Sequence, residues 1–531
     1  MTVIVLILLA CLSLPALGTL SGHISSRPTV TIDSGVVIGS ATSIPPSLGT
    51  VNHFLGIPFS EPPLRFSPPK AVASWKSAFD ASSYGPACIQ QFNYPRRSRD
   101  DLLKWANTPG PAAGESEDCL TLNVFAPATL GEGRKAVIVW IYGGGFIFGA
   151  SSLPGYDGSS LAANQDVVVV TINYRTNVFG FANSSNLPKA KRNLGLLDQR
   201  LALDWVQRNI AAFGGDPSRV TIAGESAGAM SVDALIAKPP VPVPFRAAIL
   251  QSGQTSFSIS GASEASWSTL LNMTNCAPNR DLECLRAIPA TKLKGIIERS
   301  ALTFNPISDG TTWPLNTRGA RLNSTEKCSQ IARVPVLVGS NGDEGRTFVG
   351  TLNSTALVSM LGGLKADFWQ EILNAYPIGA PGIATQADRI SKIITDVQFR
   401  CPAELMTDDS ASVGISAWRY IYNASFPNTQ LYPEPVAYHS SEISTIFGTF
   451  PHVNATMAQK ELSRIMQKAW ADFAKEPYYG PGWAAVPSVE VFSNGRKAIG
   501  EGVFGGLSET VDSSEFDARC QLYQNLYDLE Q

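Results

Sequence analysis

Ser226 lies at the centre of the motif Gly224-Glu225-Ser226-Ala227-Gly228, where a serine can act as a nucleophile. The β-prone residues 220–223 come before the motif, and small residues suited to a helix start follow it. A G-x-S-x-G between a strand and a helix is typical of a nucleophile elbow, a strained turn that exposes the serine hydroxyl. A side chain at either glycine would collide with the neighbouring strand or helix. The motif therefore predicts covalent catalysis by the serine.

A catalytic serine needs a base for its proton, and the chain has only four histidines. His23 is close to the N-terminus, and His53 is expected to lie before the central sheet begins. His452 is in a turn-like stretch that also carries a glycosylation sequon. His439 follows a strand-like run and comes after the serine, as the chain order Ser…acid…His requires. We therefore predict that His439 is the base and treat His452 as its competitor.

The base must be oriented by a carboxylate on a loop beyond a later strand. The strand-like run 334–339 is followed by the adjacent residues Asp343 and Glu344. Neighbouring side chains of an extended backbone point in opposite directions, so both cannot reach one imidazole. The residues alone leave the choice between them open.

Backbone amides are expected to stabilise the negative oxygen that forms during ester cleavage. The apolar run 137–142 leads into three glycines, residues 143–145, which let the backbone approach a substrate closely. The amide of Ala227, directly after the nucleophile, would complete this oxyanion hole.

The N-terminus indicates a secreted protein. Its apolar stretch is too short to span a membrane, and Ala16-Leu17-Gly18 resembles a signal-peptidase site, although a positive n-region is missing. We expect a signal peptide over residues 1–18 and no transmembrane segment after it. The net charge of -3 gives no support to a nucleic-acid partner.

Secretion permits disulfides and glycans. Seven cysteines follow the signal peptide, an odd number that leaves at least one unpaired within the chain, and none is in a zinc-like cluster. Six acceptor sequons are present: Asn183, Asn272, Asn323, Asn353, Asn423 and Asn454.

The apolar runs predict an α/β fold. They lack in–out alternation, which indicates parallel strands covered by helices on both faces. Residues 193–213 carry apolar residues at helical spacing. Because no linker divides the chain, we expect residues 19–531 to form one domain with long insertions at 88–119, 255–330 and 345–415. The strand-like runs are 136–142, 167–173, 220–223, 247–251, 334–339 and 418–422.

Several ordered blocks resemble the type-B carboxylesterase/lipase family, which includes cholinesterases and secreted fungal lipases. The blocks are residues 54–63, 117–124 and 193–200, followed by the stretch to Ser226. The pattern is closest to the secreted fungal carboxylesterases and lipases, since Ser440 follows His439 where cholinesterases carry glycine. The resemblance implies an α/β-hydrolase fold that needs no metal or cofactor.

The family pattern also assigns residues. It implies Glu344 as the acid, Gly144, Gly145 and Ala227 as oxyanion donors, and Glu225 and Ser252 as supporting neighbours. It implies the disulfides Cys88–Cys119, Cys276–Cys284 and Cys401–Cys520, and leaves Cys328 free.

The resemblance implies that loop 88–119 corresponds to the mobile lid of the fungal lipases. Its segment 96–105 is heavily charged, with an apolar patch of only Leu102, Leu103 and Trp105. A lid opens at an oil surface by offering buried apolar area, and this segment offers little. The position of the choline-binding aromatic of cholinesterases is Pro109 here, which disfavours choline esters.

The sequence therefore predicts a secreted serine carboxylesterase that forms an acyl-enzyme with soluble esters. Alternatives are a triacylglycerol or sterol-ester lipase, an acyltransferase with the same triad, and a non-catalytic binding domain. The oligomeric state stays open. A neutral imidazole base predicts an acid limb of kcat/KM near pH 6.5, unless the site shifts it.

Overall fold

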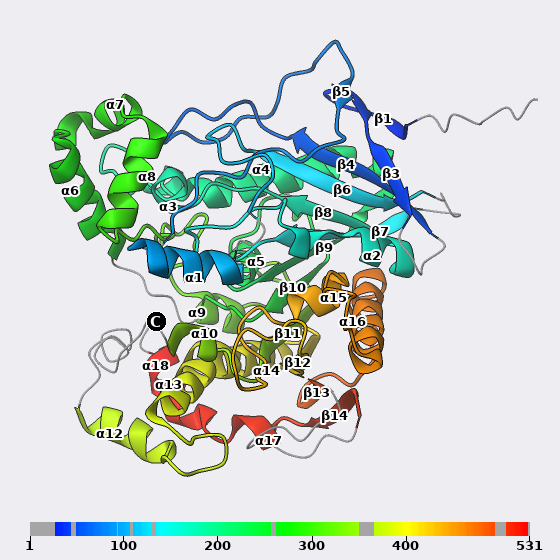
Figure 1. Ribbon diagram of the computed structural model, residues 1–531, viewed down its shortest axis with the longest axis vertical. Helices are drawn as coiled ribbons and strands as arrows, with labels where there is room; N and C mark the ends of the chain where they lie inside the picture. Colours follow the sequence, from blue (N-terminus) through cyan, green and yellow to red (C-terminus); the bar gives the residue numbers. More distant parts are fainter. Residues whose placement is uncertain are drawn as a thin grey trace, which may run out of the picture.

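The computed structural model describes residues 27–43, 49–92, 94–106, 110–128, 134–255, 262–349, 366–493 and 506–528. The expected signal peptide and His23 lie outside these ranges. Within the described part, eleven strands form one large sheet in the order β14-β13-β12-β11-β10-β9-β7-β8-β6-β4-β3 (Figure 1). The strands are β3 Ser40–Ser43, β4 Thr50–Pro58, β6 Thr121–Pro127, β7 Lys135–Ile141, β8 Val168–Ile172, β9 Gly215–Glu225, β10 Ala247–Gln251, β11 Val336–Asn341, β12 Ala417–Asn423, β13 Ser488–Ser493 and β14 Ser508–Asp512.

The centre of this sheet is parallel. From β8 through β7, β9, β10, β11 and β12 to β13, every neighbouring pair runs in the same direction. The outer strands β3, β4, β6 and β14 pair antiparallel with their neighbours. The carboxyl ends of the parallel strands therefore meet at one edge, where ligands bind in open α/β sheets.

Each predicted apolar run lies in or overlaps a central strand, β7 to β12. A separate small sheet contains the antiparallel pair β1 Thr29–Ile32 and β2 Gly35–Ile38, joined to a short β5 Phe79–Asp80. One expectation is wrong: His53 does not precede the sheet but lies inside its strand β4. This strand pairs antiparallel on both sides near an edge of the sheet, and its sequence lacks the continuous apolar run of the central strands.

Helices cover both faces of the sheet. The described helices are α1 Arg96–Ala106, α2 Ser159–Gln165, α3 Asn177–Gly180, α4 Leu194–Asn209, α5 Ala227–Ala237, α6 Ala262–Thr274, α7 Asp281–Arg286, α8 Ala290–Arg299, α9 Thr317–Leu322, α10 Arg346–Val349, α12 Ala366–Ala375, α13 Gln386–Thr395, α14 Cys401–Ser412, α15 Ile443–Phe447, α16 Met457–Lys475, α17 Ser514–Asp517 and α18 Gln524–Asp528.

The alternation of side chains along β7 separates two apolar cores. Val137 and Val139 join one core with α4 and α5, whereas Ile138 and Trp140 join the other with α2, α15 and α16. The predicted helix over 193–213 is α4, continued by a 3₁₀ turn and ended at Gly214 in the left-handed region (φ 85°). Strands covered on both faces explain why their sequences read as continuous apolar runs.

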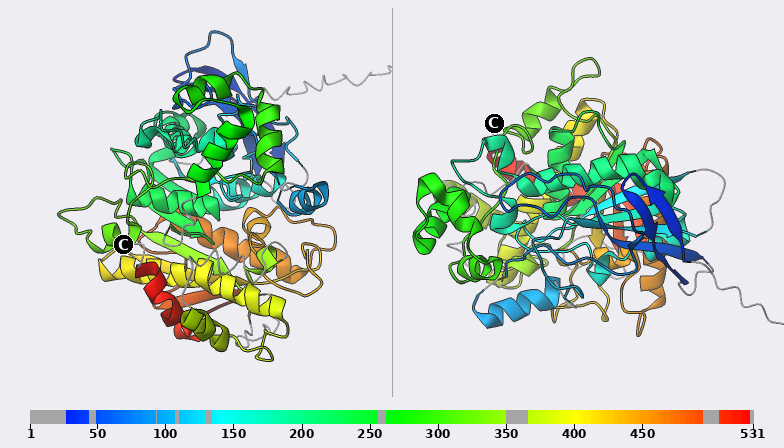
Figure 2. Two further views of the ribbon diagram at one scale, coloured as in Figure 1. Left: turned by 90° about the vertical axis from the view of Figure 1, so that its left-hand side faces the viewer. Right: turned by 90° about the horizontal axis from the view of Figure 1, so that it is seen from above.

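The insertions lie around this scaffold. Figures 1 and 2 place the small sheet of β1 and β2 and the C-terminal helices at opposite ends of the molecule.

All three implied disulfides, Cys88–Cys119, Cys276–Cys284 and Cys401–Cys520, are present. Cys328 is exposed and unpaired with another described cysteine.

The two glycines of the serine motif allow three elements to approach one another closely. A Cβ at Gly228 would lie 2.0 Å from the carbonyl oxygen of Ile141, the last residue of β7. A Cβ at Gly224 would lie 2.5 Å from the carbonyl carbon of Gly228. The contacts are with backbone atoms, which have little freedom to move, so the predicted steric reason for both glycines agrees with the packing.

Replacing Gly228 with alanine should therefore destabilise the protein. We expect Gly228→Ala to lower the free energy of unfolding by about 3 kcal/mol or to prevent soluble expression, because β7 and α5 must separate. Gly155→Ala is the matched control, since nothing lies within 4 Å of its added Cβ. Thermal unfolding of both variants checks this, and a Gly228→Ala protein as stable as the control would contradict it.

Candidate active site

Ser226 lies at the turn between β9 and α5, as the sequence predicts. Its backbone has φ 55° and ψ -124°, a conformation that a residue other than glycine rarely adopts. The turn is held by the amide of Ser226, which donates to the carbonyl oxygen of Gln251 at 2.8 Å, at the end of β10. The serine is thus presented at the carboxyl edge of the parallel sheet.

His439 is bound to Glu344. The Nδ1 atom of His439 lies 2.6 Å from Oε2 of Glu344, and both residues are buried. The other carboxylate oxygen, Oε1, accepts the backbone amide of Asn341 at 2.6 Å. This fixes the glutamate on the turn that follows β11.

The neighbouring Asp343 has different partners. Its carboxylate accepts a hydrogen bond from the hydroxyl of Ser391 and lies 3.3 Å from the guanidinium of Arg346. The structure therefore brings Glu344, and not Asp343, to the imidazole, as the resemblance implies.

The histidine loop is fixed from two sides. The side-chain amide of Asn341 donates to the carbonyl oxygen of Tyr438 at 2.8 Å, directly before His439. The rings of Phe348 and Phe399 pack on the imidazole at centroid distances of 5.3 and 4.9 Å. These contacts hold the ring in one orientation.

Neither of the other described histidines is brought to Glu344. His53 Nε2 lies 2.7 Å from the hydroxyl of Ser159 at the start of α2. His452 is exposed and packs against Phe450.

Glu225 connects the histidine to the serine. Its Oε1 lies 3.2 Å from Nε2 of His439, and its backbone is adjacent to Ser226. A Cβ built on Gly143 would lie 2.6 Å from Oε2 of Glu225 and 2.9 Å from Cβ of Ser226. The Nε2 side of the imidazole thus lies beside Glu225, the residue directly before the elbow serine, and the glycine loop lies against Glu225 and Ser226.

The predicted oxyanion loop follows β7. Gly144 and Gly145 have φ values of 103° and 60°, which glycine adopts without strain. Ala227 is the first residue of α5, where an amide has no acceptor within its own helix. Ala227 is thus part of the elbow, and Gly144 and Gly145 follow Gly143, whose added Cβ would lie 2.9 Å from Cβ of Ser226.

The other expected supporting neighbour is Ser252. It follows β10, and its hydroxyl has no hydrogen-bond partner among the described residues. The next residue, Gly253, lies against the backbone of Ser226, because its Cβ would be 2.3 Å from that carbonyl oxygen.

Sequence reasoning missed Glu442. Its buried carboxylate accepts hydrogen bonds from Gln251 at 3.0 Å and from Asn341 at 2.6 Å. Its position three residues after His439 was the only signal, and a sequence does not distinguish a buried carboxylate from a surface one.

Three buried carboxylates surround one imidazole, and they shift its titration. Burial opposes protonation of His439, but the charges of Glu225, Glu344 and Glu442 outweigh it and raise the pKa of the imidazole. Burial also raises the pKa of Glu225, against the opposing effect of His439. The two groups compete for the same proton, so they titrate as a pair.

Metal-ligand geometry is found in one place within the described residues, at Cys401, Glu404 and Cys520. The two sulfur atoms are bonded to each other, so this group offers no metal site.

A parallel sheet with helices on both faces and a serine at a strand-to-helix elbow define an α/β-hydrolase. Residues 26–480 match the model of the carboxylesterase family, and the chain belongs to this family. The protein is a carboxylic ester hydrolase, which confirms the class that the sequence predicted.

Several curated relatives have similar sequences. The acetylcholinesterase of Bungarus fasciatus is 34% identical, over 84% of this chain and 78% of the relative. The cholinesterase of Mus musculus is 33% identical, over 85% of this chain and 79% of the relative. The fumonisin B1 esterase of Sphingopyxis macrogoltabida is 33% identical, over 80% of this chain and 79% of the relative.

The carboxylates around His439 predict the pH dependence of activity. Because the pKa of the imidazole is raised, His439 should stay protonated to a higher pH, and the acid limb of kcat/KM should lie above pH 6.5. Glu225→Gln removes one negative charge and should move this limb to lower pH. Rates on a soluble p-nitrophenyl ester from pH 5 to 9 measure the acid limb of the wild type and of Glu225→Gln. The same midpoint in the two proteins would contradict the argument.

Proposed function

We propose that the protein is a secreted serine carboxylesterase that hydrolyses soluble esters through an acyl-enzyme. The observation that carries the proposal is the 2.6 Å contact between His439 Nδ1 and Glu344 Oε2. In the neutral imidazole the proton on Nδ1 is held by this carboxylate, so Nε2 carries none and can accept the proton of Ser226.

In the proposed reaction, the hydroxyl oxygen of Ser226 attacks the ester carbonyl carbon while His439 takes the proton. The imidazolium then gives the proton to the leaving alcohol, and the acyl group stays on the serine. Water, deprotonated by the same nitrogen, then attacks the acyl carbon, and the imidazolium returns the proton to the oxygen of Ser226 as the acid is released. Glu344 orients the ring and stabilises its positive charge.

The amides of Gly144, Gly145 and Ala227 are the proposed oxyanion donors. Negative charge develops on the carbonyl oxygen in the transition state, and fixed amides in a buried site stabilise it without reorganisation. This requires the loop after β7 to lie against the elbow, which the short distances from Gly143 to Glu225 and Ser226 support.

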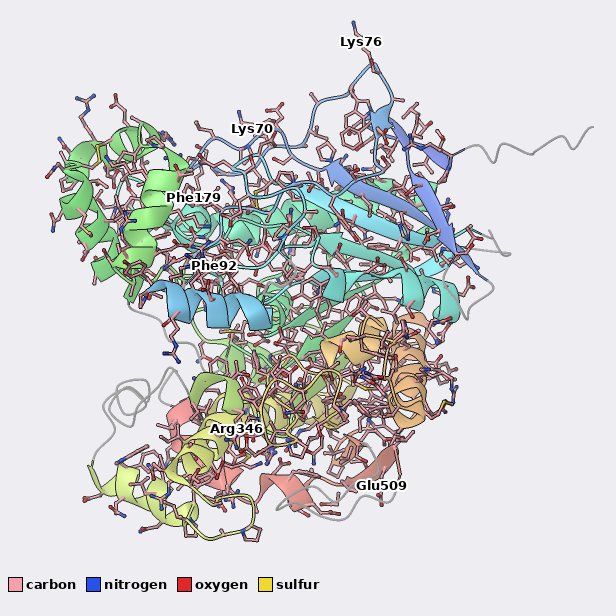
Figure 3. The ribbon with its side chains drawn as sticks, viewed as in Figure 1. Lys70, Lys76, Phe92, Phe179, Arg346 and Glu509 are labelled. Carbon is pink, nitrogen blue, oxygen red and sulfur yellow. A yellow bond between two sulfur atoms is a disulfide. The ribbon has the colours of Figure 1, made fainter. Side chains whose placement is uncertain are left out.

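The lid segment supports soluble substrates. Helix α1 contacts α8 through Arg99, which lies 3.3 Å from Glu298, and Lys294 lies 2.7 Å from Glu115. Phe92, labelled in Figure 3, has both cationic groups near its ring, Arg99 at 5.2 Å and Lys294 at 5.3 Å. Charged contacts of this kind expose little apolar area when they open, and water screens them.

Choline esters, the substrates that the names of two relatives suggest, are disfavoured by Pro109, which lies outside the described residues. We propose a neutral ester of modest size as the substrate.

Secretion is proposed from the N-terminal segment, the disulfides and the sequons, with residues 19–531 as one domain. No described helix has the length and apolarity of a membrane span. Asn272, Asn323 and Asn454 are exposed and suit glycans, whereas the amide nitrogen of Asn423 is buried. Asn183 is half-buried and accepts a hydrogen bond from Arg192, and Asn353 lies outside the described residues.

Ser226→Ala should abolish ester hydrolysis. We expect kcat on a p-nitrophenyl ester to fall by about 10³-fold or more, since the nucleophile is lost and the oxyanion donors remain. Ser152→Ala is the matched control, because it removes another buried serine hydroxyl, one without a hydrogen-bond partner among the described residues. Mass spectrometry after a fluorophosphonate probe should find the label on Ser226 alone. Label on another residue, or hydrolysis that survives in Ser226→Ala, would refute the assignment.

The charged lid predicts weak interfacial activation. On tributyrin, the rate should rise smoothly with concentration and show no step at the solubility limit, because α1 offers little apolar surface to an oil phase. Initial rates measured across that limit test this. A several-fold jump once droplets form would instead support the lipase alternative.

A further inference from the structure

Ser440, the residue after the proposed base, has an unusual backbone conformation. Its φ of 72° lies in the left-handed region, which is strained for a residue other than glycine. Glycine would remove this strain, so the serine side chain needs another reason to be there. Strained residues of this kind persist where surrounding contacts fix them, often at functional sites.

The hydroxyl of Ser440 donates a hydrogen bond to Oε1 of Glu225. This is the same oxygen that lies 3.2 Å from Nε2 of His439. The other oxygen of the carboxylate faces the loop at Gly143. The serine therefore contacts the carboxylate at the point where it meets the base.

We propose that Ser440 is a positioning residue of the reaction: its hydroxyl fixes the carboxylate of Glu225 beside His439 and thereby sets the pH at which the imidazole becomes a base. This inference rests on the proposed role of His439.

The physical effect has a definite sign. A hydrogen bond to a carboxylate favours its anionic form, and the anion stabilises a neighbouring imidazolium. Without the hydroxyl, Glu225 more readily takes up the proton for which it competes with His439, and it becomes neutral. The imidazolium then loses an adjacent negative charge, so His439 releases its proton at a lower pH.

The other groups around this pair do not change when Ser440 is altered. Two other carboxylates act electrostatically on this pair, Glu344 and Glu442. The charge of Glu225 in turn affects three buried tyrosines: Tyr156, Tyr174 and Tyr420. The two glutamates keep their own donors from Asn341 and Gln251 in every variant below.

Two substitutions separate the hydroxyl from the backbone strain. Ser440→Ala and Ser440→Gly both remove the hydrogen bond, so both should move the acid limb of kcat/KM to lower pH by about half a unit or more. Only glycine relieves the strained φ, so Ser440→Gly should have the higher Tm of the two. A purely structural role would change Tm and leave the acid limb where it is in the wild type, which would overturn the proposal.

The dependence on Glu225 is tested in a double-mutant cycle. In the Glu225→Gln background, Ser440→Ala should produce no further shift of the acid limb, because the carboxylate that it acts on is gone. A shift of the same size in both backgrounds would overturn the proposal.

A measurement without turnover separates this inference from the proposed function. The proton between His439 Nδ1 and Glu344 can be observed by NMR, and its chemical shift reports the protonation of the imidazole as pH is changed. The measurement compares Ser226→Ala protein with the double variant that also carries Ser440→Ala. A lower midpoint in the double variant supports the role of Ser440, and an unchanged midpoint overturns it. Loss of activity in Ser226→Ala tests the nucleophile independently.

Discussion

The site depends on holding three carboxylates around one imidazole in a buried place. Glu225, Glu344 and Glu442 are each almost fully removed from solvent, which strongly disfavours unpaired charges. Each is therefore satisfied separately: Glu344 by the Asn341 amide and His439, Glu442 by two side-chain amides, and Glu225 by Ser440 and the imidazole. Asn341 takes part twice, through its backbone and its side chain, and so links the acid turn to the histidine loop.

The fold supplies these partners from separate parts of the chain. Glu225 ends β9, Gln251 ends β10 and Asn341 ends β11, and these three strands are neighbours in the parallel sheet. The three side chains therefore meet at one edge, although they lie far apart in the sequence. His439 comes from the loop that follows β12, the next strand in the sheet. The order of the parallel strands thus determines which side chains meet at the site.

This explains how far sequence reasoning could reach. Ser226 and the central strands were predictable, because an elbow motif and continuous apolar runs reflect local packing constraints. Without the family resemblance, the choice between Asp343 and Glu344 was not predictable, since it depends on Ser391 and Arg346, which hold the aspartate away from the histidine. His53 was misplaced and Glu442 was missed for the same reason. Each is defined by partners distant in sequence, which no local pattern contains.

Strained backbone conformations also occur at this edge of the sheet. Phe146 follows β7, Ser226 follows β9 and Ser252 follows β10, and all three have positive φ values, as does Ser440 beside the base. Such conformations cost of order 1–3 kcal/mol each and persist only where the surroundings enforce them. Here the strands below are buried on both faces and fully paired, so they can hold strained turns in place. The rigidity of the sheet is therefore what allows a serine hydroxyl, an amide loop and a carboxylate to be fixed around one histidine before a substrate arrives.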